Sequence, residues 1–267
     1  MHTVGVVATK YFFSRLYGYK RRDLIHKNMK IHTPQLLVFI RHGETPRNVV
    51  QSHSPIHFRD HESKKGVAGI PDHCIPLTPR GIAQARRVGK ELKNRFGAFD
   101  TAYHSGYVRT EKTLAGILEA YTAEERARLA IKRSIRLRER ESGYSFDMTK
   151  DEAEQHFPWM ADYWKTIGPL FARPSGGESL AQVIERVEPF LEKMFREEEG
   201  KRVCVVMHGR VLAAIRFLLE NWTYEEAEAF LNHRSPKNCG VTVYRPDSKN
   251  GILALSEYNT VYEPDTA

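Results

Sequence analysis

Two apolar runs in this chain end on the same dipeptide, His-Gly. Residues 36–43 read LLVFIRHG, and residues 202–209 read RVCVVMHG. Such runs are typical of buried parallel strands, and open α/β sheets bind ligands at the carboxyl ends of their strands. If the two strands are neighbours, His42 and His208 face each other across one crevice, with Arg41 beside the first. Cations that hold a phosphate and an imidazole that attacks it predict phosphoryl transfer through a histidine.

Strand and helix patterns alternate along the chain. Strands are expected at residues 36–40, 99–104, 130–135, 202–207, 240–245 and 252–258. Helices are expected at residues 78–96, 107–121, 178–199, 209–220 and 223–232. This alternation predicts an α/β fold, a three-layer α/β/α sandwich with a mostly parallel central sheet. Residues 51–76, which contain three prolines, are expected to form a long loop that is either functional or disordered.

Further motifs follow the first His-Gly in order. They are IPLTPRGIAQARRVG at 75–89, YHSGYVRTEKTL at 103–114, LRERESG at 137–143, GGESLAQVIERV at 176–187 and MHGR at 207–210. Together with RHGET at 41–45 they resemble the histidine phosphatase superfamily, in the branch named after the phosphoglycerate mutases. The resemblance spans about residues 36–245 and implies that branch's fold and a phosphohistidine intermediate.

A phosphomonoester carries nearly two negative charges, so an attack on it needs cations first. Arg41 and Arg109 each offer a planar guanidinium to phosphate oxygens. His42, neutral on its attacking nitrogen, is the expected nucleophile, and its other ring nitrogen must donate to a fixed acceptor. A cationic His208 would stabilise charge in the transition state. The simple alternative for a single histidine is a core residue, but the paired His-Gly strand ends favour function.

The leaving alkoxide needs a proton donor, and the resemblance implies Glu139 as the general acid and base. Arg140 beside it could hold substrate. The same resemblance implies Asn48 and Ser105 as hydrogen-bond donors to the phosphate. Taken alone, residues 136–141 would be read as a solvated run of charges, so this assignment depends on the flanking motifs.

The histidines of residues 53–61 offer a metal site as an alternative. His53, His57 and His61 recur at four-residue spacing and could share a helix face, but Pro55 interrupts that helix. We therefore expect no metal and no other cofactor. The favoured role of residues 51–76 is a mobile lip over the site, and the alternative is an exposed loop that contacts nothing.

Charge divides the chain into two parts. Residues 1–33 carry seven basic side chains and one acidic side chain, which leaves residues 34–267 almost neutral. We expect a basic N-terminal extension at 1–33 and a histidine phosphatase domain at 34–263. The extension could contact membranes or polyanions weakly or target an organelle, or it could be a dispensable leader before Met29. No specific nucleic-acid partner is expected.

Three scattered cysteines fit a reducing compartment, and no apolar stretch is long enough to span a membrane, so a cytoplasmic location is expected. The expected partner is a small phosphorylated substrate, and a homo-oligomer is compatible with the sequence.

The sequence is compatible with three functions. The leading hypothesis is a phosphomonoester hydrolase that works through phosphohistidine. The first rival is a phosphoglycerate-type mutase, which must exclude water from its phosphoenzyme. Only 38 residues separate Glu139 from Glu178, and this is shorter than the corresponding segment in the glycolytic mutases that the chain resembles. The second rival is a catalytically silent relative that binds phosphorylated ligands, which the intact set of candidate residues disfavours.

Overall fold

The central feature of the fold is one mixed six-stranded sheet with the strand order β3-β2-β4-β1-β5-β6. The computed structural model describes residues 33–50, 57–231, 236–248 and 251–262. Its strands are β1 (Leu36–Arg41), β2 (Thr101–His104), β3 (Ala130–Arg133), β4 (Arg202–Met207), β5 (Val241–Pro246) and β6 (Leu253–Thr260). β3, β2, β4 and β1 run parallel, whereas β5 pairs antiparallel with β1, and β6 antiparallel with β5. The predicted, mostly parallel sheet is confirmed.

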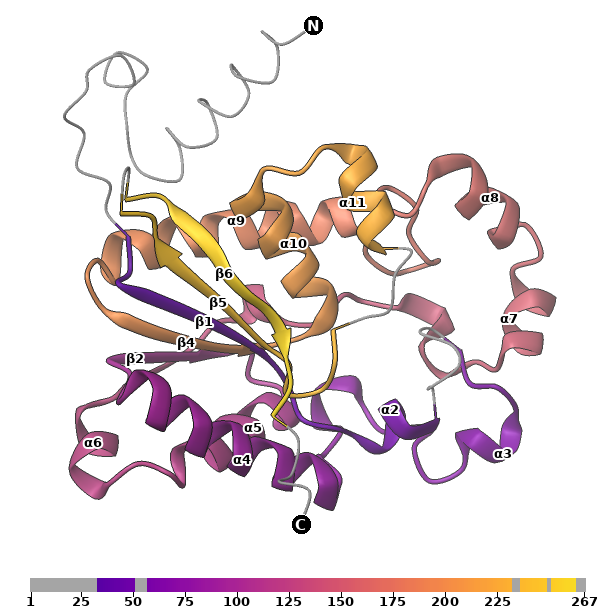
Figure 1. Ribbon diagram of the computed structural model, residues 1–267. Helices are drawn as coiled ribbons and strands as arrows, with labels where there is room; N and C mark the ends of the chain where they lie inside the picture. The colour runs from indigo at the N-terminus through magenta and orange to yellow at the C-terminus, as the bar shows by residue number, and fades with distance from the viewer. Residues whose placement is uncertain (1–32, 51–56, 232–235, 249–250, 263–267) are drawn as a thin grey trace, which may run out of the picture.

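Helices cover both faces of this sheet (Figure 1). The α-helices are α2 (Pro46–Val50), α3 (His61–Lys64), α4 (Pro79–Phe96), α5 (Val108–Leu118), α6 (Ala123–Arg128), α7 (Lys150–His156), α8 (Met160–Ile167), α9 (Leu180–Glu197), α10 (Gly209–Glu220) and α11 (Tyr224–Leu231). Single 3₁₀ turns are η2 (Asp72–Cys74), η3 (Ile135–Leu137) and η4 (Gly143–Asp147). The five helices expected from the sequence correspond to α4, α5, α9, α10 and α11.

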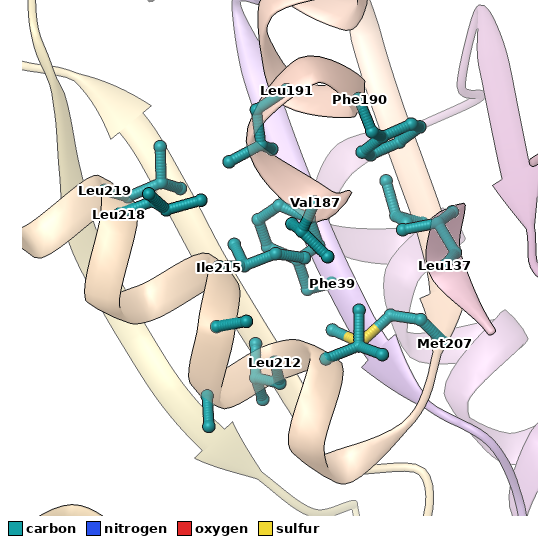
Figure 2. Close-up of a cluster of buried hydrophobic side chains, with 14 of the residues drawn as sticks. Phe39, Leu137, Val187, Phe190, Leu191, Met207, Leu212, Ile215, Leu218 and Leu219 are labelled. Atoms are coloured by element: carbon teal, nitrogen blue, oxygen red, sulfur yellow. The ribbon is translucent and has the colours of Figure 1, made fainter. Parts of the chain in front are cut away.

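The sheet separates two apolar cores because successive side chains of a strand point to opposite faces. In β1, Val38 and Ile40 pack with residues of α4 and α5. Phe39 packs on the other face, against Val187 of α9 and Ile215 of α10 (Figure 2). β1 is buried on both faces, as its continuous apolar sequence predicts.

Helix α4 begins where the sequence predicts it. Thr78 accepts a hydrogen bond from the backbone N–H of Gly81 at 3.0 Å, and Pro79 occupies the first turn. α4 then packs closely on α5, because a Cβ atom at Gly89 would lie 2.3 Å from the carbonyl oxygen of Ile117. Helix α4 is thereby held against the helix that carries Arg109.

The segments beyond the carboxyl ends of the parallel strands differ from the expectation. Residues 57–76 contain α3 and η2, and residues 150–167 form α7 and α8, which were not predicted. These helices span at most eight residues each, so their apolar periodicity is short. The two segments contact each other: Phe58 forms a β-bridge with Thr149, and Lys64 pairs with Glu152 at 2.9 Å. We term residues 57–76 and 143–172 the cap.

Parts of the sequence-based interpretation fall on residues that the structure does not describe. The extension at 1–33 lies outside the described residues except for Thr33, and so does His53. Within the described ranges, no helix has the length and apolar character needed to cross a membrane.

A buried carboxylate ties the end of α9 to β2 and β3. One oxygen of Glu198 accepts from Lys132 Nζ at 2.6 Å and Tyr103 Oη at 2.7 Å. The other accepts from Thr101 Oγ1 at 2.8 Å and Lys201 Nζ at 3.0 Å. Burial raises the pKa of Glu198, but these hydrogen bonds outweigh it and lower the pKa to about 2. The carboxylate is therefore ionised in the folded protein at any pH above that value.

We predict that Glu198→Gln lowers the free energy of unfolding by about 2 kcal/mol or more, because charge-assisted bonds in a buried site are lost. Wild type should lose this stabilisation as the pH falls from the ordinary glutamate value of 4.5 through about 2, and Glu198→Gln should lack that dependence. Urea unfolding at several pH values measures both effects. Glu197→Gln is the matched control, since Glu197 also pairs with Lys132 but is exposed. Equal effects of the two variants would contradict the prediction.

Candidate active site

The pairing of β1 with β4 determines where the two histidines lie. The strands run parallel with Arg41 opposite Met207, so the next residue of each, His42 and His208, lies at the same edge of the sheet. The backbone N–H of His42 extends the ladder by donating to the Met207 carbonyl at 2.9 Å. The two imidazole rings lie 5.3 Å apart, centroid to centroid. The structure thus brings together the two His-Gly strand ends.

His42 is held in one tautomer. Its Nδ1 lies 2.8 Å from the carbonyl oxygen of Gly43, which can only accept, so Nδ1 carries the proton and Nε2 keeps its lone pair. Burial lowers the pKa of His42 well below 6.5, and the charges of Arg109 and Arg41 lower it further. The side chain is therefore neutral at physiological pH and presents a nucleophilic nitrogen.

The loop after His42 leaves little room for movement. The N–H of Gly43 donates to Thr113 Oγ1 at 2.9 Å, and that hydroxyl donates to the Arg109 carbonyl at 2.6 Å. A Cβ atom at Gly43 would lie 2.5 Å from the carbonyl oxygen of Gly81 in α4. Only glycine permits this approach, which fixes the loop after His42 on the first turn of α4.

The two predicted arginines lie close to the histidines. Arg41 donates through Nη1 to the carbonyl of Pro236, while its buried Nε has no hydrogen-bond partner among the described residues. Arg109 is buried with its guanidinium 4.7 Å from the centre of the Tyr107 ring. Each arginine lowers the pKa of both histidines, which places their charges near both rings. The arrangement is a buried, positively charged site with donors available to an anion.

An aspartate of the cap engages one of these arginines. Asp72 Oδ1 lies 3.0 Å from Arg109 Nη1, and Asp72 Oδ2 accepts from Nη2 at 3.2 Å. The Asp72 carbonyl also accepts from Nη1. Sequence reasoning did not predict this contact between Asp72 and Arg109.

Asn48 and Ser105 both have defined partners. Asn48 Oδ1 accepts from Thr45 Oγ1 at 3.0 Å and from Asn238 Nδ2 at 3.0 Å. Asn238 Nδ2 also donates to the His42 carbonyl at 3.1 Å, which links Asn48 to the backbone of His42. Ser105 Oγ lies 2.9 Å from His208 Nε2, so Ser105 contacts the second histidine directly.

Glu139 lies on a loop that a partly buried ion pair supports. Glu178 accepts from Arg186 Nε at 2.9 Å and from Arg138 Nη2 at 2.6 Å. Arg186 also donates to the carbonyls of Arg138 and Glu139 at 2.9 and 3.2 Å. The backbone of Gly143 also packs closely on the segment before Glu178, because a Cβ atom at Gly143 would lie 2.1 Å from the Ser175 carbonyl oxygen. The LRERESG and GGES motifs thus form one rigid unit.

Of the two glutamates in this unit, Glu139 is the one that acts on the site arginines. Its charge raises the pKa values of Arg41 and Arg210 against the lowering effect of burial. Glu141 instead interacts with Glu178 and Arg138, and its side chain is half-exposed.

Arg140 and Arg210 extend the positive region. Arg140 is buried, its guanidinium lies 5.9 Å from the centre of the Trp164 ring of α8, and burial followed by the charge of Arg210 lowers its pKa to about 10. Arg210 directly follows the second His-Gly pair in the sequence. Trp164 was missed because α8 was not predicted.

The described residues contain no group of three or more His, Cys, Asp or Glu side chains that could hold a metal ion. His57 and His61 belong to the cap, and His61 lies 3.9 Å from Glu152. The donors at the site suit an anion better than a cation, since they are arginine and imidazole nitrogens.

Comparisons with known proteins agree with this geometry. Residues 37–259 match the sequence profile of the histidine phosphatase superfamily (branch 1). The chain is 33% identical over 197 residues to a 2,3-bisphosphoglycerate-dependent phosphoglycerate mutase of Methylobacterium radiotolerans, a match that covers 71% of this chain and 81% of the mutase. It is 26% identical over 225 residues to phosphoglycerate mutase-like protein AT74H of Arabidopsis thaliana, covering 77% and 73% of the two chains.

Solved structures share the fold. YhfR of Bacillus stearothermophilus superposes with a TM-score of 0.65 at 23% identity, over 85% of this chain and 98% of that one. A mycobacterial glucosyl-3-phosphoglycerate phosphatase, solved with VO3, gives a TM-score of 0.63 at 22% identity, over 85% and 99% of the two chains. With its profile match over most of the sequence, its sheet order and its paired histidines, this chain belongs to branch 1 of the histidine phosphatase superfamily.

Proposed function

We propose that the protein is a phosphomonoester hydrolase that forms a phosphohistidine on His42. The observation that carries this proposal is the bond from His42 Nδ1 to the Gly43 carbonyl, which leaves Nε2 unprotonated beside the positive charges of Arg41 and Arg109. A neutral imidazole with a fixed tautomer is a nucleophile, and buried guanidinium groups attract the dianionic phosphoryl group to it. The substrate is a small phosphorylated molecule.

Each candidate residue has a step in this reaction. The phosphoryl group binds Arg41 and Arg109, with Asn48 and Arg140 as further donors to substrate oxygens, while Ser105 Oγ lies against His208 Nε2. His42 Nε2 forms a bond to phosphorus while the bond from phosphorus to the leaving oxygen breaks. Protonated Glu139 gives its proton to that oxygen, and the alcohol departs. Cationic His208 stabilises the charge that spreads over the equatorial oxygens.

The second half of the reaction restores the enzyme. A water molecule attacks phosphorus and transfers a proton to Glu139, now acting as a base. The bond from phosphorus to His42 Nε2 breaks, and inorganic phosphate leaves. His42 returns to its neutral form, and Glu139 is again protonated.

A mutase is the second candidate, because relatives about 30–33% identical to this chain are named 2,3-bisphosphoglycerate-dependent phosphoglycerate mutases. A mutase must keep water away from phosphohistidine until the acceptor is phosphorylated. Only 38 residues separate Glu139 from Glu178 here, and α7 and α8 occupy part of this short segment. This length supports the hydrolase.

The cytoplasmic location, the homo-oligomer and the weak polyanion contact of residues 1–33 stay as predictions.

A panel of phosphomonoesters tests the choice between hydrolase and mutase. Phosphate release is measured with and without EDTA, beside the interconversion of phosphoglycerates primed with 2,3-bisphosphoglycerate. We expect phosphate release from at least one alkyl phosphate to be faster than the interconversion and insensitive to EDTA. Faster interconversion than release would assign the mutase activity, and absence of both would favour a silent phospho-ligand-binding protein.

We predict that Glu139→Gln slows alkyl phosphates by about 10²- to 10⁴-fold and slows 4-nitrophenyl phosphate by less than about tenfold, because a nitrophenolate leaves without protonation. Glu141→Gln is the matched control, since Glu141 is two residues away and exposed. Steady-state kcat/KM for both substrate classes measures the difference. If Glu141→Gln shows the selective loss and Glu139→Gln does not, the general acid has been assigned to the wrong glutamate.

A further inference from the structure

A chain of buried hydroxyl groups connects α5 to the second histidine. Thr110 Oγ1 lies 2.8 Å from the Tyr107 carbonyl oxygen and 3.0 Å from Ser105 Oγ. Ser105 Oγ lies 2.9 Å from His208 Nε2. Thr110, Ser105 and His208 are all buried, so each proton in the chain must be accounted for within the protein.

Proton counting fixes the direction of every bond in this chain. A carbonyl oxygen only accepts, so the single hydroxyl proton of Thr110 goes to the Tyr107 carbonyl. Thr110 Oγ1 must then accept from Ser105, which uses the single proton of Ser105. Ser105 Oγ therefore accepts from its remaining neighbours, the N–H of Tyr107 at 3.3 Å and His208 Nε2. His208 thus carries a proton on Nε2.

The consequence concerns the other ring nitrogen. With Nε2 committed to Ser105, Nδ1 is the nitrogen through which His208 could contact a phosphoryl group. Nδ1 is buried and has no hydrogen-bond partner within the part of the chain that the structure describes. In the neutral ring this atom is a lone pair, which repels a phosphate oxygen, whereas in the imidazolium it is an N–H donor. His208 can therefore assist an anion only after it gains a proton.

The charged groups around His208 oppose that proton in the empty site. Burial lowers the pKa of His208 well below 6.5, and Arg109, His42, Arg41 and Arg186 lower it further in that order. These groups come from α5, β1 and its end, and α9. A bound phosphoryl dianion adds two negative charges among them and so favours the imidazolium.

We propose that Thr110 is a positioning residue that fixes the direction of the Ser105 hydroxyl and thereby makes phosphate binding take up one proton on His208 Nδ1. The proton comes from solvent and forms an N–H bond at the lone pair of His208 Nδ1. In the binding step, neutral His208 thus takes up one proton and phosphate binds to the resulting imidazolium. The role rests on the proposed function. If Ser105 were free to turn, it could donate to Nε2, and a neutral His208 with its proton on Nδ1 could bind phosphate without any uptake.

Thr110→Val and Thr110→Ser form the matched pair that tests this role. Valine keeps the shape of threonine and removes the acceptor for Ser105, whereas serine keeps the acceptor. Calorimetric titration with inorganic phosphate near pH 8.5, in buffers of different ionisation enthalpy, counts the protons taken up. At this pH the ligand is mainly the dianion. We expect about one proton for wild type and Thr110→Ser, and close to none for Thr110→Val.

Catalysis supplies a second readout. Thr110→Val should lower kcat by about tenfold or more while its Kd for phosphate at high pH stays equal or improves, because a neutral His208 binds the anion but stabilises the transition state less. A merely structural role would weaken binding at every pH and leave the proton count unchanged. Uptake of one proton by a folded Thr110→Val, or of none by wild type, would overturn the proposal.

The tautomer can also be observed directly, which keeps the test decisive if Thr110→Val does not fold. Imidazole ¹⁵N spectra of the wild-type protein should show His208 protonated on Nε2 alone in the free state and on both nitrogens with phosphate bound. A free His208 protonated on Nδ1 would overturn the proposal. Failure of wild type to bind phosphate at all would instead remove the proposed function, and this role with it.

Discussion

The parallel pairing of β1 with β4 is the constraint on which the rest of the site depends. Because Arg41 lies opposite Met207 in this register, His42 and His208, which are 166 positions apart in the sequence (208 − 42), lie at the same edge of the sheet. A slip of one residue would turn every side chain of β1 to the other face, and Phe39 would leave its core against α9 and α10. The two apolar cores therefore hold the catalytic geometry as well as the fold.

Much of this arrangement was predictable, because its signals are local. The apolar runs predicted β1 and β4, and the helix expected at residues 78–96 corresponds to α4. The cap was not predicted as helical, since α7 and α8 are too short for a clear apolar period. Thr149 and Glu152 nevertheless form a capping box at the start of α7, and this Thr-x-x-Glu pattern is a local signal that was available in the sequence.

The site shows the same division between local and long-range information. Motif resemblance suggested His42, Arg109 and His208, and the structure places them together. The resemblance could not indicate that Asp72 contacts Arg109. This contact joins the 3₁₀ turn η2 to helix α5, and the two residues are 37 positions apart in the sequence. Nor could the resemblance show that Thr110 and Ser105 orient His208, because the direction of a hydroxyl depends on three-dimensional neighbours. Sequence patterns thus identify reacting groups more readily than the groups that set their protonation.

The most direct test of the account is to identify the residue that carries the phosphoryl group. Wild-type protein is mixed with a ³²P-labelled phosphomonoester, quenched within the first turnover, and digested for peptide mapping. We predict an acid-labile, base-stable label on the peptide that contains His42, and no label in His42→Ala. An acid-stable label on another residue, or a His42→Ala variant that retains a tenth of the wild-type rate, would contradict the phosphohistidine mechanism.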